Sequence, residues 1–354
     1  MTAVAITGLG LVTALGRTTG ENARALIEGR TALAPARRLD VSGFRSAVVA
    51  EVPGGACASP ARRAALTDAA WREAAAAAAL DRPPPGTLVL RACQVPEPAW
   101  GGCPGGEDAF VSQACASMAV AICLSRDLLL AGLGQVAVVL GAAALDRSEY
   151  ANMDVLRALS PVGARPFDVE RDGTTLGEGG AAVVLERLDR AAGRGAAVLA
   201  VVAGAACAID PRGGRAASSG EAIRDVVAAA LDDAGVGELG YVHAHATGTP
   251  QGDDAELDAL EAVAEDRGWH DVPVGSSKGA LGHLLHASAA PGLLAAVVAF
   301  QHGVRLGTPG SVSVAGRDRV RVLVEAAPGW RDAPVLVNSF GFAGSCASLV
   351  LTPP

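Results

Sequence analysis

An almost wholly apolar helical segment between two strands is the feature that most limits what this chain can fold into. Residues 107–113 (EDAFVSQ) have strand character, residues 114–132 (ACASMAVAICLSRDLLLAG) form the helical segment, and residues 135–144 (QVAVVLGAAA) have the composition of a buried strand. A strand, a crossover helix and a second strand in this order indicate a parallel sheet covered by helices. The sequence therefore predicts an α/β protein.

The same order of elements returns in the second half of the chain. After a Gly-containing stretch near residue 194, a strand (196–207), a helix (221–235) and a strand that runs into a loop (241–248) follow one another. No residue-level repeat accompanies this order, so the duplication rests on the elements alone. We expect two similar βαβαβ-type halves, at residues 1–190 and 191–354.

Two further expectations concern residues near the start of the chain and a long apolar segment of the second half. The sequence predicts a first strand at 3–7, a Gly-rich loop at 8–16, and a continuous helix over residues 282–303. Gly8 and Gly10 form a GxG, but the full phosphate-cradling spacing is absent, so a dinucleotide site is not favoured.

Composition excludes several classes of protein. The 354 residues carry 29 basic and 37 acidic side chains, for a net charge of −8, and show no Lys/Arg stripe. A nucleic-acid binder is therefore not expected. The first residues lack the charged start of a signal peptide, and no apolar run is long enough to span a bilayer.

The cysteines indicate the redox environment. The seven Cys of the sequence contain no CxxC pair, which favours reduced thiols in a cytoplasmic protein.

Cys115 is the first candidate for chemistry. It lies where the polar end of a strand turns into the apolar helix, so its sulfur would face the unpaired N–H groups of a helix N-terminus. Such a position lowers the pKa of a thiol and provides donors for an oxyanion. From this local pattern alone, a small residue buried at a strand–helix junction is an equally good interpretation.

Two other segments carry candidate groups. The run 243–256 (HAHATGTPQGDDAE) follows a short strand, whose end in an open α/β sheet would direct imidazoles into a ligand cleft. The alternative is a metal site, with His243, His245 and Asp253 as donors. The run 276–290 (SSKGALGHLLHASAA) contains Lys278 and His283. A single histidine such as His283 would more often be a core residue, but a lysine is seldom buried without a charged partner or a functional role.

Together these segments have the order found in one known family. The chain resembles the β-ketoacyl synthases of the thiolase superfamily in TGLG (7–10), ACAS (114–117), RPFDVERDGTTLGEG (165–179), AHATGTPQGD (244–253), SSKGALGH (276–283) and NSFGFAG (338–344). The resemblance implies a thiolase-like fold in which the two halves form a layered α-β-α-β-α architecture.

The resemblance also implies residue roles. Cys115 would be the acylated nucleophile, assisted by His245, His283 and Lys278. Neutral imidazoles are the donors that an enolate oxygen needs, which agrees with this mapping. The remaining implied roles are support of the imidazoles (Glu178 and Asp253), an oxyanion hole and gate (the N–H groups of Cys115 and Phe342, with Phe340) and contact with the pantetheine arm (Thr247 and Thr249).

The chain departs from the family pattern near the site. His243 and Ala246 replace the usual Asn and Gly, His286 stands where a small residue is common, and FGFAGSC replaces the usual double Gly and Asn. The stretch between the strand at 87–93 and Cys115 is shorter than in typical relatives, which places acyl specificity and self-pairing in question.

The expected activity is an acyl transfer from acyl carrier protein to Cys115, followed by decarboxylative Claisen condensation with a malonyl-type thioester in a specialised polyketide or fatty-acid-like pathway. No resident cofactor or metal is expected, because phosphopantetheine arrives on the carrier protein. Two alternatives stay open. One is transfer of the acyl group to an amine, alcohol or water, or its cyclisation, without decarboxylation, and the other is a heterodimer subunit that shapes a partner's pocket. Expected partners are acyl carrier protein, with Arg212 and Arg215 as contact candidates, and a second chain in a homodimer or heterodimer.

Overall fold

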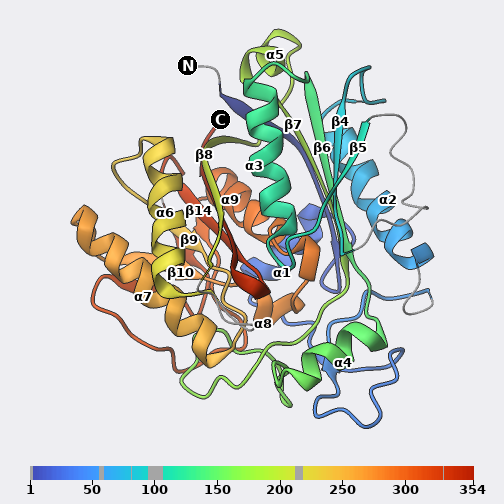
Figure 1. Ribbon diagram of the computed structural model, residues 1–354, viewed down its shortest axis with the longest axis vertical. Coiled ribbons are helices and arrows are strands. Elements are labelled where there is room, and N and C mark those ends of the chain that lie inside the picture. The colour runs from blue at the N-terminus through green and yellow to red at the C-terminus, as the bar shows by residue number, and fades with distance from the viewer. Residues whose placement is uncertain (1–2, 56–59, 81, 95–106, 212–217, 330) are drawn as a thin grey trace.

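The computed structural model describes residues 3–55, 60–80, 82–94, 107–211, 218–329 and 331–354 (Figure 1). Arg212 and Arg215, the candidate carrier-protein contacts, lie outside the described residues. The described helices are α1 (Thr19–Ile27), α2 (Pro60–Ala77), α3 (Ser117–Leu130), α4 (Arg147–Val155), α5 (Leu188–Gly193), α6 (Gly220–Ala234), α7 (Pro250–Arg267), α8 (Lys278–Leu281) and α9 (Ala290–His302), with short 3-10 turns η1 (Leu285–Ala287) and η2 (Phe342–Gly344).

The strands of the described residues form one large sheet and two small two-stranded sheets. The large sheet has the order β12-β10-β9-β14-β15-β8-β1-β7-β6-β4-β5. Its strands are β1 (Val4–Thr13), β4 (Leu88–Ala92), β5 (Glu107–Val111), β6 (Val136–Ala143), β7 (Gly179–Arg187), β8 (Ala200–Ile209), β9 (Tyr241–His243), β10 (Val272–Gly275), β12 (Val320–Val322), β14 (Val335–Phe340) and β15 (Ser345–Thr352). The small sheets pair β2 (Ala34–Pro35) with β3 (Val48–Val49) and β11 (Val304–Arg305) with β13 (Ala327–Pro328).

The strand pairing of the first half is repeated in the second. In β5-β4-β6-β7-β1, strand β4 runs parallel to β5 and β6, whereas β7 runs antiparallel to β6 and β1. In β10-β9-β14-β15-β8, strand β9 runs parallel to β10 and β14, whereas β15 runs antiparallel to β14 and β8. Strands β1 and β8 join the two halves as an antiparallel pair. The predicted duplication is therefore visible in the pairing, while the boundary at residue 190 stays a prediction.

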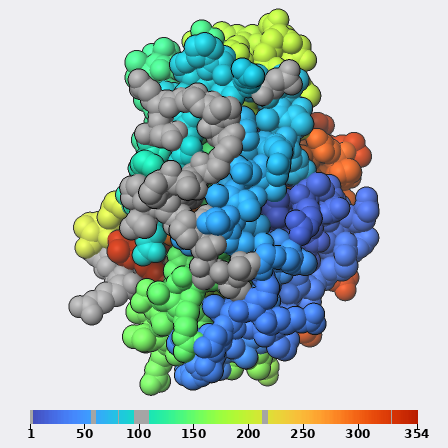
Figure 2. Space-filling view, turned by 90° about the vertical axis from the view of Figure 1, so that its right-hand side faces the viewer, coloured from blue at the N-terminus to red at the C-terminus, as the bar shows by residue number. Residues whose placement is uncertain are grey.

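Helices cover both half-sheets and fill the space between them. Helix α2 packs on the outer face of β1 and β7, on the side of the molecule that Figure 2 shows. Helices α3 and α9 contact strands of both halves and form the central layer, and α6 packs on β8 and β15 with α7 beside it (Figure 1). The layers thus alternate helix, sheet, helix, sheet, helix. Among the described helices, none has both the length and the apolar character needed to cross a lipid bilayer.

The first strand is longer than expected. We predicted a strand at 3–7 and a loop at 8–16, but β1 continues to Thr13. The glycines belong to the strand because α2 lies directly on them: a Cβ at Gly8 would be 2.2 Å from the Ala74 carbonyl oxygen, and one at Gly10 would be 1.9 Å from the Ala70 carbonyl oxygen. Glycine therefore permits close helix–strand packing here rather than ending the strand.

The expected helix over residues 282–303 is interrupted. The regular helix α9 begins only at Ala290, after a 3-10 turn and with a Pro in its first turn. Gly282 has a φ of +72°, and His283 lies in a bridge with Leu176. This irregular segment takes His283 out of the helix and places it beside the nucleophile.

Candidate active site

Cys115 lies at a sharp turn between β5 and α3. Ala114 before it has a φ of +45°, a conformation that non-glycine residues rarely adopt. The Ala114 carbonyl oxygen accepts hydrogen bonds from the Ser117 hydroxyl at 2.7 Å and the Ser117 N–H at 3.2 Å, which hold the turn. The side chain of Cys115 is almost completely buried. The predicted junction of strand and helix is present.

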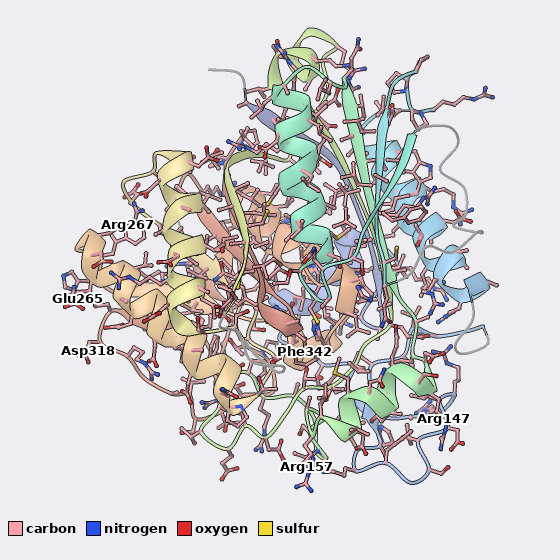
Figure 3. The ribbon with its side chains drawn as sticks, viewed as in Figure 1. Arg147, Arg157, Glu265, Arg267, Asp318 and Phe342 are labelled. Atoms are coloured by element: carbon pink, nitrogen blue, oxygen red, sulfur yellow. The ribbon has the colours of Figure 1, made fainter. Side chains whose placement is uncertain are left out.

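The loop after β14 lies directly against the nucleophile. A Cβ at Gly341 would be 3.2 Å from the Cys115 nitrogen and 2.9 Å from the Gln113 carbonyl oxygen, so only glycine fits without displacement. In Figure 3, Phe342 lies close to the lower end of α3. Within the described residues, neither the Cys115 N–H nor the Phe342 N–H donates to another group. Both donors are therefore available to an oxyanion, as the family resemblance implied.

The two predicted imidazoles lie next to each other at this turn. The ring centroids of His245 and His283 are 5.4 Å apart at an interplanar angle of 80°. Both His283 ring nitrogens and Nδ1 of His245 are buried without a hydrogen-bond partner among the described residues. Burial, aided by the positive charge of Lys278, holds the pKa of both rings well below the usual value. Both rings are therefore neutral at physiological pH.

Lys278 stands behind the imidazoles as the only lysine in the 354-residue sequence. It is 4% exposed, and its Nζ donates to the backbone carbonyl of His245. Burial lowers the pKa of Lys278 to about 8, while the charge of Glu256 opposes this shift. Glu256 accepts from the N–H groups of His245 at 2.9 Å and Ala246 at 2.8 Å, and from Asn338 Nδ2 at 2.9 Å. This carboxylate therefore fixes the backbone of the His245 loop and balances the lysine.

The prediction that Glu178 supports the imidazoles is wrong. The Glu178 side chain is buried, but it accepts from the Val52 N–H at 3.1 Å and forms ion pairs with Arg62 at 3.0 Å and with Arg38. These contacts hold the residue just before β7 against the segment around residue 52, and none of them reaches an imidazole. The sequence analysis did not identify Glu256 as a supporting residue. Asp253 and Glu256, at positions i and i+3 of one helix, lie on the same helix face, and this spacing could have indicated it.

Asp253 supports the site through its loops. Its carboxylate accepts from the Phe167 N–H at 2.7 Å and the Gly248 N–H at 3.1 Å, and burial raises its pKa to about 7. His243 faces another partner, with Nε2 3.1 Å from the Ser277 hydroxyl. The alternative metal site would need His243, His245 and Asp253 to converge. The described part of the chain contains no group of three His, Cys, Asp or Glu side chains placed to hold a metal ion.

The expected low pKa of the nucleophile is also wrong. Burial raises the pKa of the Cys115 thiol to about 12, even though the positive charge of Lys278 favours the thiolate. Desolvation therefore outweighs the helix N-terminus and the cation. The resting thiol is protonated, so attack on a thioester must be accompanied by transfer of this proton to a base.

Two cavities meet at Cys115. The first encloses about 550 Å³, including its open mouth, and brings the predicted side chains together in one lining: Cys115, His245, His283, Phe340, Phe342, Thr247 and Thr249. The second, of about 800 Å³, reaches Cys115 from the side of α4. A substrate arm and an acyl chain can thus approach the thiol from different directions.

Two family models match this chain. The model for the β-ketoacyl synthase N-terminal domain matches residues 105–191, and the model for the C-terminal domain matches residues 199–310. The chain belongs to the β-ketoacyl synthase family. The two matches together cover more than half of the chain and include all four residues of the Cys–His–His–Lys set.

This β-ketoacyl synthase chain is similar to a polyketide enzyme and to solved ketosynthases. It is 34% identical over 263 residues to mellein synthase of Phaeosphaeria nodorum, a match that covers 70% of this chain but only 15% of the relative. The ishigamide ketosynthase/chain length factor superposes with a TM-score of 0.89 at 27% identity, over 100% of this chain and 99% of that chain. A β-ketoacyl synthase from Burkholderia phymatum superposes with a TM-score of 0.88 at 25% identity over the full length of both chains. The predicted thiolase-like fold is confirmed.

Proposed function

We propose that this chain catalyses the decarboxylative condensation of an acyl group, carried on Cys115, with a malonyl-type thioester. The observation that carries this proposal is the convergence, in one pocket, of the Cys115 thiol, two neutral imidazoles and the backbone N–H groups of Cys115 and Phe342. Among the described residues, these N–H groups and three of the ring nitrogens have no hydrogen-bond partner. Each of these groups matches one requirement of the reaction.

The first step transfers the acyl group. The sulfur of Cys115 attacks the thioester carbonyl of an acyl carrier protein, an imidazole nitrogen takes the thiol proton, and the N–H groups of Cys115 and Phe342 bind the tetrahedral oxyanion. Collapse breaks the bond to the carrier thiol, which leaves with a proton. The raised pKa of Cys115 requires the proton acceptor, and the lowered pKa of the imidazoles keeps that acceptor unprotonated.

The second step forms the carbon–carbon bond. The malonyl-type unit loses carbon dioxide, and the electron pair of the broken bond becomes an enolate. Its oxygen accepts hydrogen bonds from His245 and His283. The enolate carbon then attacks the acyl carbonyl on Cys115, a C–C bond forms and the C–S bond breaks. The released Cys115 thiolate takes up one proton from solvent, which restores the resting thiol. Neutral imidazoles suit this step because each keeps one N–H to donate.

The proposal includes acyl carrier protein as the donor partner and phosphopantetheine as its substrate arm. Thr247 and Thr249 line the first cavity, and their hydroxyl oxygens lie 2.9 Å apart, where they can bond the amides of such an arm. Two structural neighbours are a ketosynthase/chain length factor and an acyl carrier protein in complex with its ketosynthase. These neighbours support a carrier partner and a dimer formed with a second copy or another ketosynthase-like chain.

Intact-mass spectrometry after incubation with acyl carrier thioesters tests the first step. We expect one acyl adduct on the wild type and none on Cys115→Ala, while Cys123→Ala, which removes another buried thiol of α3, retains the adduct. Uptake by Cys115→Ala would refute the assignment. Addition of malonyl carrier protein should then release carbon dioxide and a ketone product. An adduct that turns over without carbon dioxide release would instead show transfer to an amine, alcohol or water.

A further inference from the structure

We propose that His286 makes this protein selective for acyl groups that carry a hydroxyl or amino group near the thioester. The inference rests on the proposed function, because it concerns the acyl chain that Cys115 would carry. It starts from a histidine at a position where the family commonly has a small residue.

His286 is attached to the turn that carries the nucleophile. Its Nδ1 lies 3.1 Å from the Ala114 carbonyl oxygen and 3.3 Å from the Ser117 hydroxyl. Ala114 is bonded directly to Cys115, so the ring lies within one residue of the acyl attachment point. His286 also lines the second cavity, which reaches Cys115.

These contacts fix the proton on the ring. A backbone carbonyl can only accept, so Nδ1 must be the nitrogen that carries hydrogen. Burial keeps the pKa of His286 below its usual value, so the ring holds a single proton. The other nitrogen, Nε2, is therefore a lone-pair acceptor, and it lies on the opposite side of the ring from the Ala114 carbonyl. The cavity wall thus presents a hydrogen-bond acceptor close to Cys115.

The remainder of the cavity matches a mixed acyl chain. Met153, Leu156, Leu285 and Phe342 provide apolar surface. Glu149 and Asn152, one turn apart on α4, add a carboxylate and an amide to the lining. The Nε2 of His286 favours a group that donates a hydrogen bond. A saturated hydrocarbon chain would leave the Nε2 of His286 without a donor in the cavity, which is costly once water is displaced.

The test compares acyl uptake from carrier thioesters of equal chain length: butanoyl, (R)- and (S)-3-hydroxybutanoyl, and the 3-methoxybutanoyl analogues. The methyl ethers keep the oxygen but cannot donate. We expect one hydroxy enantiomer to acylate Cys115 about 3- to 10-fold faster than both the butanoyl and the matching methoxy compound, as one neutral hydrogen bond would give.

Two variants then locate the effect. His286→Asn keeps a side-chain N–H for the Ala114 carbonyl but lacks Nε2, so the ratio of hydroxybutanoyl to butanoyl rates should fall to about 1. His302→Asn, at an exposed position at the end of α9, should keep the wild-type ratio. A purely structural role of His286 would lower both rates together and leave the ratio unchanged, which would overturn the inference.

The wild-type measurement decides the matter even if His286→Asn fails to fold. Equal rates for hydroxy, methoxy and unsubstituted chains would refute selectivity while leaving the proposed condensation intact. Absence of uptake from every thioester would refute the proposed function itself, and the inference with it.

Discussion

Lys278 offers a direct measurement of the electrostatics of the site. Because it is the only lysine of the sequence, protein labelled with ¹³C-lysine should give a single side-chain Cε resonance that needs no assignment. We expect this resonance to titrate with a midpoint near pH 8, since burial lowers the pKa of Lys278 to about 8. A midpoint above pH 10 would show a solvated amine and refute the buried cluster.

Replacement of Glu256 by Gln should move this midpoint further. The variant keeps the shape of the side chain and one of the two oxygen acceptors for the His245 loop, and it removes the nearby negative charge. An opposite charge at close range changes a pKa by about 1 to 3, so the midpoint should fall to roughly pH 5–7. Glu178→Gln is the matched control, because it also removes a buried carboxylate but one that Arg38 and Arg62 bind. A midpoint unchanged by Glu256→Gln, or one equally shifted by Glu178→Gln, would contradict the assignment of Glu256 as the partner.

The same titration has a consequence for stability, with a defined sign. Between pH 8 and the unfolded value of 10.5, the unfolded chain binds the lysine proton and the folded chain does not, so the free energy of unfolding rises with pH in this window. The shift corresponds to about 3 kcal/mol. Urea unfolding of the wild type and Lys278→Met at pH 7 and pH 10 should show most of this gain in the wild type only. An equal pH dependence in both proteins would refute the linkage.

Three further outcomes are expected. Gly341→Ala should slow acyl uptake roughly 100-fold in the intact-mass assay, because its Cβ would press on the Gln113 carbonyl oxygen and the Cys115 nitrogen; wild-type rates would show that the loop can yield. Cys207 is exposed, and a hydrogen bond with Cys123 lowers its pKa to about 7. Its rate of reaction with iodoacetamide should therefore be half-maximal near pH 7, and Cys123→Ala should move this midpoint towards pH 9. Glu186→Gln should lower the free energy of unfolding, measured in urea, by about 3 to 5 kcal/mol, because it breaks the ion pair of buried Glu186 with Arg194 at 3.0 Å. The titration midpoint of Lys278 should stay near pH 8 in this variant.

Much of the fold follows from local sequence patterns. The apolar runs around residues 114–144 and 200–243 predicted strands and crossover helices, because buried strands and helices each need a continuous apolar surface. The errors came from glycine and from irregular backbone. Gly8 and Gly10 look like a loop in the sequence but lie in a strand, because the reason for them is the α2 backbone that packs on them from sixty residues away.

The side chains of the site were predicted better than their support. The positions of Cys115, His245, His283 and Lys278 are set by strand ends and turns, and the structure brings all four together. Long-range packing decides which residue binds a buried carboxylate. Nothing near Glu178 in the sequence shows that Arg62 and Arg38 bind it, because these residues lie 116 and 140 positions away. The pKa of Cys115 likewise depends on how completely the final packing excludes water.

Burial is the main cause both of the Cys115 pKa of about 12 and of the low pKa of the two imidazoles, and the charge of Lys278 acts on all three groups. The cation of Lys278 favours ionisation of Cys115 and disfavours protonation of His245 and His283. Both effects serve the proposed reaction, because it needs a thiol that can lose its proton and rings that still donate an N–H afterwards. Burial keeps the resting thiol unreactive until a thioester carbonyl arrives and the proton moves in the same step. A lysine suits this place better than one of the many arginines of the chain, since a compact ammonium fits behind the rings and its pKa of about 8 leaves the charge present at neutral pH.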